Sequence, residues 1–199
     1  MSSNIPPVAP IRFDTREGRS LLHSLAQKCL PYDPHDLSLD VTGHILEQKD
    51  VFLRTACGAG KTGIIALLAY ILPDVCNRSA LVPTFTPWYN KDPVILVLCP
   101  TDTLELDIEH KLKSMGVQAT ALNLEILKKA QNSEKQGAER EIWDAAKSSR
   151  VILLSLELLS GDRFHQEMDL DNPASSFQTC CSILIVDEVH MVWLWGPQF

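Results

Sequence analysis

Three uninterrupted apolar runs constrain the fold of this chain more than any other feature. They occupy residues 94–99, 151–155 and 182–186. Continuous stretches of Val, Ile and Leu are typical of strands that are buried on both faces, as in a parallel sheet. Leu104, Ile108 and Leu112 recur on one helical face between the first two runs. The alternation predicts an α/β fold with a mainly parallel sheet and helices on both of its faces.

The remaining segments fit this alternation. Leu21, Leu22 and Leu25 indicate a short helix before Pro31, and Asp36 begins a second helix that ends near residues 47–48. The other expected elements are a strand at 51–55, a buried helix at 63–72, a long loop at 73–93, a strand at 117–122, and helical residues 124–148 divided by Gly137. We expect an N-terminal arm and short helix at 1–30, and one domain at 31–199.

Composition excludes several classes of protein. The chain has 199 residues, 45% hydrophobic and 22% charged, which is enough to bury one core. A net charge of −7 argues against a protein that coats nucleic acid by charge alone. The N-terminus lacks a secretory h-region, and the longest apolar run, 62–73, is too short to span a bilayer. We therefore expect an intracellular protein with no membrane partner.

The six cysteines show no metal-binding or disulfide pattern. There is no C-x-x-C pair, and the adjacent Cys180 and Cys181 would need strained geometry to bridge each other. Most of the cysteines lie in apolar runs, so we interpret them as small buried residues in a reducing compartment.

A glycine-rich turn lies between the strand expected at 51–55 and the helix expected at 63–72. Gly58 and Gly60 allow successive N–H groups to point inward, and the positive end of the next helix strengthens this phosphate cradle. Lys61 would reach the β- and γ-phosphates, and the Thr62 hydroxyl would hold Mg²⁺. The strict G-x-x-x-x-G-K-[ST] pattern fails at its first position, Thr55. The other backbone positions of the expected cradle are Cys57, Ala59 and Gly63.

A carboxylate pair follows the last apolar run. Asp187 would emerge at the carboxyl edge of the sheet, where parallel sheets bind ligands, and would complete the Mg²⁺ shell. Glu188 would orient or deprotonate an attacking water, and His190 would sense the γ-phosphate through a hydrogen bond. Together with the glycine-rich turn, this pair predicts a nucleoside triphosphate site.

These motifs resemble a known family. Residues 55–62 (TACGAGKT) look like helicase motif I, and residues 187–190 (DEVH) look like motif II of superfamily 2, the DEAD/DEAH-box group. The chain is most similar to RecQ-like DNA helicases of the fungal type. Residues 96–107 and 116–123 are similar to motif Ia and the segment after it, and 151–157 to motif Ib, with Leu156 in place of a proline. The resemblance implies a three-layer RecA-like P-loop NTPase domain that uses ATP and Mg²⁺.

The same resemblance implies a nucleic-acid partner. Relatives carry an aromatic loop after motif II, and Trp195 and Phe199 fall at the matching offsets. Exposed indole rings stack on bases. Trp193, which lies in the same loop, has no counterpart in the family. Thr101 and Thr103 would bond DNA phosphates, or would cap the next helix. The implied partner is DNA, single-stranded or at a duplex junction, and the implied location is the nucleus.

One position departs from the family pattern. Relatives carry a glutamine that reads adenine where this chain has Ser38. A hydroxyl cannot donate and accept along the adenine edge as a carboxamide does. ATP binding would then be weaker or less selective, although Tyr32 or His35 could stack on the base.

Three functions remain open at this stage. The first is the N-terminal RecA-like domain of a RecQ-like helicase that is C-terminally truncated and lacks the second RecA-like domain. The second is a degenerate, non-catalytic nucleotide- or DNA-binding fragment, which Ser38 and the missing domain favour. The third is another P-loop NTPase such as a transporter or kinase, against which DEVH and the motif Ia match argue.

The truncation makes a prediction about activity. In the family the second RecA-like domain supplies arginine fingers, and losing such a finger costs on the order of 10³–10⁵ in rate in comparable NTPases. We expect the purified 199-residue chain not to separate DNA strands in an unwinding assay with a forked duplex. Measurable unwinding would contradict this expectation.

Overall fold

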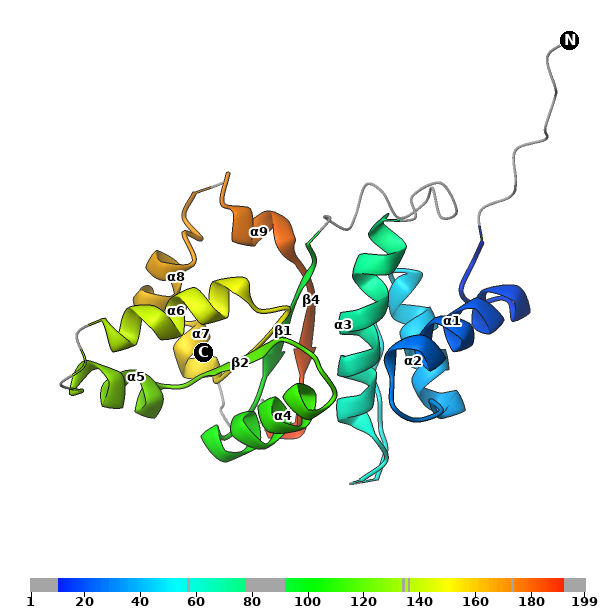
Figure 1. Ribbon diagram of the computed structural model, residues 1–199, viewed down its shortest axis with the longest axis horizontal. Helices are drawn as coiled ribbons and strands as arrows, with labels where there is room; N and C mark the ends of the chain where they lie inside the picture. Colours follow the sequence, from blue (N-terminus) through cyan, green and yellow to red (C-terminus); the bar gives the residue numbers. More distant parts are fainter. Residues whose placement is uncertain are drawn as a thin grey trace, which may run out of the picture. The chain divides into compact units, whose positions relative to one another are not determined.

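The computed structural model describes residues 11–56, 58–77, 92–133, 135, 137–172 and 174–191. The chain divides into two compact units, Met1–Trp88 and Tyr89–Phe199. The described helices of the first unit are α1 (Arg16–Cys29), α2 (Asp36–Leu46) and α3 (Lys61–Asn77). Figure 1 labels these three helices.

The three helices of the first unit pack on one another. The Thr15 side chain caps α1 by accepting a hydrogen bond from the Gly18 N–H at 3.2 Å. Arg19 of α1 forms ion pairs with Asp36, at 2.8 Å, and with Asp40, both on α2. The fully buried leucine and isoleucine side chains of these helices are Leu22, Leu46, Leu67, Leu68, Ile71 and Leu72.

The first unit confirms the three predicted helices and corrects two other predictions. The predicted strand at 51–55 is wrong, because this segment pairs with no strand among the described residues, and Phe52 is 78% exposed. An apolar run becomes a strand only where a neighbour supplies hydrogen bonds. The loop predicted from residue 73 is wrong over its first residues, since α3 continues through Pro73 to Asn77. Val75 is buried in that last turn, which keeps the helix packed beyond the proline.

The second unit is built on a parallel sheet. Its strands are β1 (Val94–Leu98), β2 (Ala119–Leu122), β3 (Val151–Leu154) and β4 (Cys181–Val186). They lie in the order β2-β3-β1-β4 and every pair is parallel. All four were predicted, and the α/β class with a parallel sheet is confirmed (Figure 1).

The second unit's longer helices were predicted, and its shorter ones were not. The longer ones are α4 (Asp102–Ser114), α5 (Leu124–Gln131) and α6 (Ala138–Ser148), with Gly137 at the predicted break. The short helices α7 (Leu156–Leu159), α8 (Asp162–Glu167) and α9 (Ser176–Cys180) follow β3. They span only one or two turns, so they carry too few residues to show a helical period.

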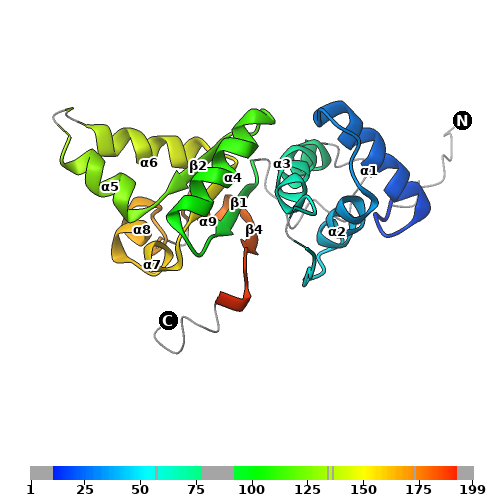
Figure 2. The ribbon, with the colours of Figure 1, turned by 90° about the horizontal axis from the view of Figure 1, so that it is seen from below.

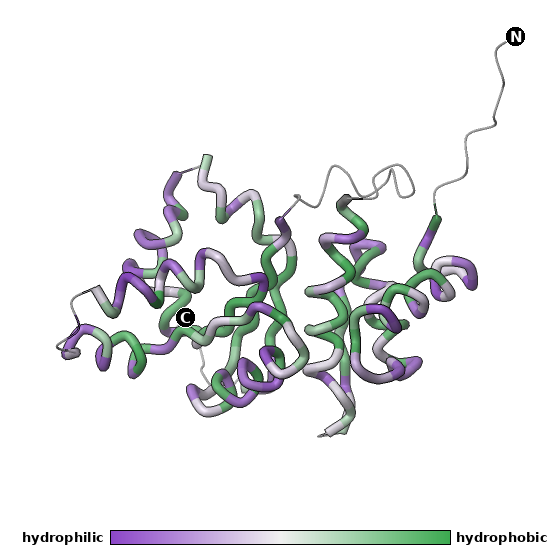
Figure 3. The backbone as a smooth tube through the Cα atoms, viewed as in Figure 1, coloured by the Kyte–Doolittle hydropathy of each residue, from purple (hydrophilic) through white to green (hydrophobic). Residues whose placement is uncertain are grey.

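One face of the sheet carries a large apolar cluster. Leu96 and Ile152 point into it from β1 and β3, and Trp143 of α6 and Phe164 of α8 meet there with ring centroids 6.4 Å apart. The buried residues of α4 lie outside this cluster, and α4 contacts β2 and β3 from the other face. Figure 2 shows the helices around the strands, and Figure 3 shows continuous hydrophobic colouring along β1.

The interpretation of the cysteines needs a correction. Among the five that the structure describes, Cys99 is buried, whereas Cys29, Cys76, Cys180 and Cys181 are only partly buried. These four cysteines lie at or next to the ends of helices and strands, where one side of the backbone faces solvent. As for membranes, none of the described helices combines the length and the apolar character that crossing a bilayer requires.

The core cluster predicts a stability effect. Phe164 is 0% exposed, so Phe164→Ala should leave a cavity and lower the free energy of unfolding by about 3–5 kcal/mol. Urea denaturation followed by circular dichroism measures this change. Leu106→Ala is the control, because Leu106 is 44% exposed and its loss should cost roughly 0.5 kcal/mol or less. A Phe164→Ala effect as small as that of the control would show that α8 does not complete the core.

Candidate functional site

The glycine-rich turn contains two glycines in left-handed backbone conformations. Gly58 and Gly60 have φ angles of 82° and 84°, in the left-handed region where a side chain would be strained. A Cβ atom placed on either glycine would meet nothing within 4 Å, so the space above both is open. The N–H of Gly63 donates to the Gly60 carbonyl at 2.8 Å as α3 begins at Lys61.

This turn presents its polar groups at the positive end of a helix. Gly58 and Gly60 are exposed, and Lys61, Thr62 and Gly63 are half-buried. An open, glycine-lined turn that enters a helix of 17 residues is a suitable place for a phosphate group. Cys57 lies outside the residues that the structure describes.

Two further residues of the first unit were considered as neighbours of the nucleotide base, Tyr32 and Ser38. The hydroxyl oxygen of Tyr32 lies so close to Gly63 that a Cβ there would be 2.5 Å from it. Tyr32 is 41% exposed, so its ring stands beside the turn with one part open to solvent. Ser38 lies inside α2 and is only 7% exposed, while its N–H donates to the His35 carbonyl at 2.9 Å. The structure thus places Tyr32, rather than Ser38, against the phosphate turn.

The carboxylate pair forms a tight turn at the end of β4. The N–H of Asp187 donates to the Leu98 carbonyl at 2.9 Å, which extends the ladder between β4 and β1 by one bond. Glu188 has a φ of 51°, and its N–H donates to Asp187 Oδ1 at 3.0 Å. A left-handed glutamate is strained, and such residues concentrate at functional sites.

Glu188 and His190 interact directly. The Nδ1 atom of His190 lies 3.2 Å from Oε2 of Glu188. The Met191 N–H donates to the Glu188 carbonyl at 2.7 Å and closes the turn. The pairing orients the carboxylate that was predicted to act on water, with the imidazole as its neighbour.

The motif Ia turn connects β1 to α4. Thr101 caps α4, because its hydroxyl oxygen accepts from the Leu104 N–H at 3.3 Å. Thr103 lies exposed in the first helical turn. The capping alternative is therefore confirmed for Thr101, and both hydroxyl groups remain near the positive end of α4.

A buried carboxyl group lies one turn into α4. Glu105 is 0% exposed, and neither of its oxygens has a hydrogen-bond partner among the described residues. Burial raises the pKa of Glu105 to about 8, and the charges of Asp102 and Glu157 add to this rise. The amide of Asn123 is close enough to oppose the shift, although its geometry makes no hydrogen bond.

Cys99 shows that these groups share one edge of the sheet. Burial raises the pKa of the Cys99 thiol, and the carboxylates of Glu105 and Asp187 raise it further. The motif Ia helix and the end of β4 therefore interact electrostatically in the second unit. Reasoning from the sequence missed Glu105, although its spacing of three residues from Ile108 places it on the buried face of α4.

The predicted site residues fall into three groups. The phosphate turn belongs to the first unit, and Thr101, Thr103, Asp187, Glu188 and His190 belong to the second. Within the second unit the motif Ia turn and the carboxylate pair occupy the same sheet edge. The predicted DNA-stacking residues, Trp195 and Phe199, lie outside the described residues, as does Trp193.

The buried Glu105 predicts a pH dependence of stability. The folded chain keeps a proton on Glu105 up to about pH 8, whereas the unfolded chain releases it near the ordinary value of 4.5. Folded protein therefore binds more protons in this window, so Glu105 makes stability fall as pH rises from 4.5 to about 8.

Glu105→Gln tests this prediction. The neutral amide has the same shape, so the free energy of unfolding of the variant should exceed that of the parent by an amount that grows with pH across the window. Chemical denaturation at a series of pH values measures the difference, and Glu125→Gln, at a 63% exposed side chain, is the control. A constant difference between parent and Glu105→Gln would mean that Glu105 ionises normally.

Comparison with known proteins agrees with the motifs. A family model described as DEAD/DEAH box helicase matches residues 39–198, which begins directly after Ser38. The ATP-dependent DNA helicase Q1 of Mus musculus is 26% identical over 164 residues, which cover 82% of this chain and 21% of that protein. The match thus spans about a fifth of that relative's length.

The family match covers motifs that lie in both units. The family match contains the phosphate turn, the motif Ia turn and the carboxylate pair. The relative supports the RecQ-like character of the chain, whereas the fungal type stays a prediction. The chain belongs to the DEAD/DEAH box helicase family.

Proposed function

We propose that this chain is the ATP-binding and nucleic-acid-binding domain of a RecQ-like DNA helicase. In the full family architecture it would couple ATP hydrolysis to DNA strand separation. The observation that carries this proposal is the open turn at Gly58 and Gly60, which enters α3 at Lys61. DEAD/DEAH helicases in general use ATP with Mg²⁺, and the residues present suit that pair.

The nucleotide site would use the residues predicted from the motifs. The N–H groups of residues 58–63 and the Lys61 ammonium would hold phosphate oxygens. The Thr62 hydroxyl and the Asp187 carboxylate would hold Mg²⁺, which supplies positive charge to the phosphates. Tyr32, beside Gly63, is a suitable neighbour for the nucleoside.

The Glu188–His190 pair would handle the water. A carboxylate held by an imidazole 3.2 Å away is fixed in orientation, and Glu188 would accept a proton from water or position it. His190 would keep this carboxylate in place and would sense the γ-phosphate through a hydrogen bond. The strained φ of 51° at Glu188 supports a functional reason for this turn.

DNA would contact the motif Ia turn. Thr101 uses a lone pair to cap α4 and keeps its hydroxyl hydrogen for a phosphate oxygen. Exposed Thr103 offers a second hydroxyl. Trp195 and Phe199 remain the proposed stacking residues, with DNA as the partner. Nuclear residence follows from the same proposal.

The rival function is a non-catalytic nucleotide or DNA binder. The observation that favours it is Ser38, which is 7% exposed inside α2 and lacks a carboxamide for adenine. In that case the phosphate turn would bind nucleotide weakly or without turnover.

A titration with ATP and Mg²⁺ separates these functions. Lys61→Ala should weaken ATP binding by roughly tenfold or more, because it removes a charged hydrogen-bond donor from the phosphates. Lys128→Ala is the matched control, since Lys128 is an exposed lysine of α5 in the other unit. Calorimetry measures binding, and phosphate release measures hydrolysis with and without single-stranded DNA.

Three outcomes are informative. Hydrolysis that rises with DNA and disappears in Lys61→Ala supports the catalytic proposal. ATP binding without hydrolysis supports the non-catalytic binder. Parent protein that does not bind ATP, or that binds it as tightly after Lys61→Ala, refutes a phosphate role for the turn.

A further inference from the structure

A cavity of about 580 Å³ lies at the amino edge of the sheet in the second unit. Its lining includes Val94 at the start of β1, Arg150 directly before β3, and Cys180 directly before β4. Because the strands are parallel, Asp187 leaves the sheet at the opposite edge. The cavity is therefore separate from the carboxylate pair and the motif Ia turn, and no family motif explains it.

Arg150 carries an unsatisfied charged donor in this cavity. Its backbone is fixed, since its N–H donates to the Gln118 carbonyl at 3.0 Å and its carbonyl accepts from the Ile95 N–H at 2.9 Å. Its side-chain Nη1 atom is buried and has no hydrogen-bond partner among the described residues. A buried donor on a cation is costly when it is unpaired, so its presence calls for an acceptor from outside the chain.

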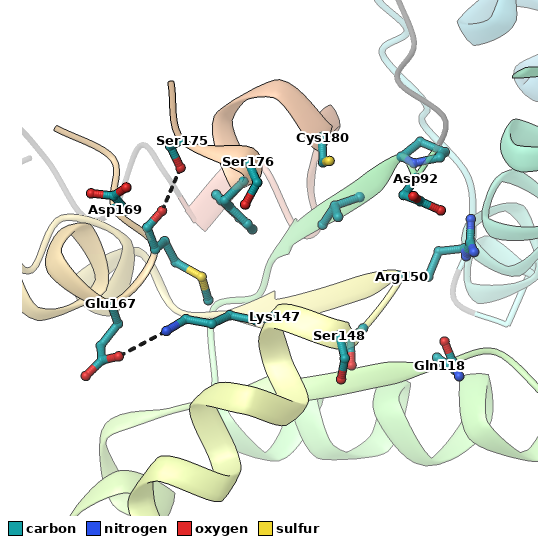
Figure 4. Close-up of a pocket in the computed structure, with 15 residues that line it drawn as sticks. Asp92, Gln118, Lys147, Ser148, Arg150, Glu167, Asp169, Ser175, Ser176 and Cys180 are labelled. Atoms are coloured by element: carbon teal, nitrogen blue, oxygen red, sulfur yellow. Dashed lines mark hydrogen bonds and ion pairs between the residues drawn. The ribbon is translucent and has the colours of Figure 1, made fainter. Parts of the chain in front are cut away.

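The other charges of the lining are arranged differently. Lys147 Nζ lies 3.2 Å from Glu167 Oε2, so this lysine is already neutralised. Figure 4 shows that pair at one end of the cavity and Arg150 with Asp92 at the other. Asp92 and Arg150 form no ion pair in the described structure. Of the two cationic side chains in the lining, Arg150 is the one that forms no ion pair with a described residue.

The chemistry of the lining points to one class of ligand. A guanidinium group is planar and presents parallel N–H donors that match a carboxylate or a phosphate. Gln118 and Ser176 add an amide and a hydroxyl, and Met168 and Phe177 add apolar surface. The volume lies within the usual range of small-molecule sites.

We propose that this cavity binds a small organic anion, a carboxylate or a phosphate ester, with Arg150 as the group that recognises its charge. The apolar part of the ligand lies against Phe177 and Met168. The proposal is independent of ATP binding, because it uses neither the phosphate turn nor the carboxylate pair.

The probes are benzoate and phenyl phosphate, with benzamide as the uncharged equivalent of benzoate. The full chain carries Lys61→Ala in every sample, so that the phosphate turn does not compete. Ligand-observed NMR titrations give the dissociation constants. We expect saturable binding of at least one anion and much weaker binding of benzamide; the preferred anion identifies the ligand as carboxylate or phosphate ester.

Three variants locate the site. Arg150→Gln should weaken anion binding by about tenfold or more, because a charged hydrogen bond is lost. Lys147→Gln is the matched control and should change binding by less than roughly twofold, since Glu167 already neutralises this lysine. Asp92→Asn should tighten binding, because it removes a negative charge near Arg150.

Several results would overturn the proposal. They are the absence of saturable binding of both anions, equal losses in Arg150→Gln and Lys147→Gln, or benzamide bound as tightly as benzoate. If Arg150→Gln does not fold, Asp92→Asn and the comparison of benzoate with benzamide still test whether the cavity recognises a negative charge. Weaker anion binding in Asp92→Asn would contradict an anionic ligand.

Discussion

The parallel pairing of β1 with β3 and β4 is the constraint on which the second unit depends. Leu98 is in register with Leu154 on one side and Val186 on the other, so the strands end at the same level. Whatever follows each strand must therefore gather at one edge. This is how Cys99, Ser155 and Asp187, far apart in sequence, come to lie in one region.

That edge concentrates negative charge, and the structure shows the physical consequence. Glu105 is buried one turn from the cap of α4, where desolvation and neighbouring carboxylates favour its neutral form. Burial raises the pKa of the Cys99 thiol, and the carboxylates of Glu105 and Asp187 raise it further. The opposite edge holds the cavity with Arg150.

The sequence predicted much of the fold because its signals were local. The apolar runs at 94–99, 151–155 and 182–186 became strands, and Gly137, with a φ of 84°, divided α5 from α6. Residues 51–55 have the composition of a strand but pair with no strand in the described part of the chain, and composition carries no information about a partner. The short helices α7, α8 and α9 had no period to detect. At the site, the glycine turn, Thr101 and the carboxylate pair were predicted, and Glu105 was missed.

The sequence by itself determined the four strands of the sheet, the longer helices, the glycines that adopt left-handed conformations, and the order of motifs that places the chain in the DEAD/DEAH box helicase family. Those properties depend on residue type and on near neighbours along the chain. Only the tertiary structure decided that Glu105 is buried with no hydrogen-bond partner among the described residues, that Tyr32 lies against Gly63, and that Arg150 lines a cavity. Burial, close contact and unpaired donors arise between residues distant in sequence, so packing alone sets them.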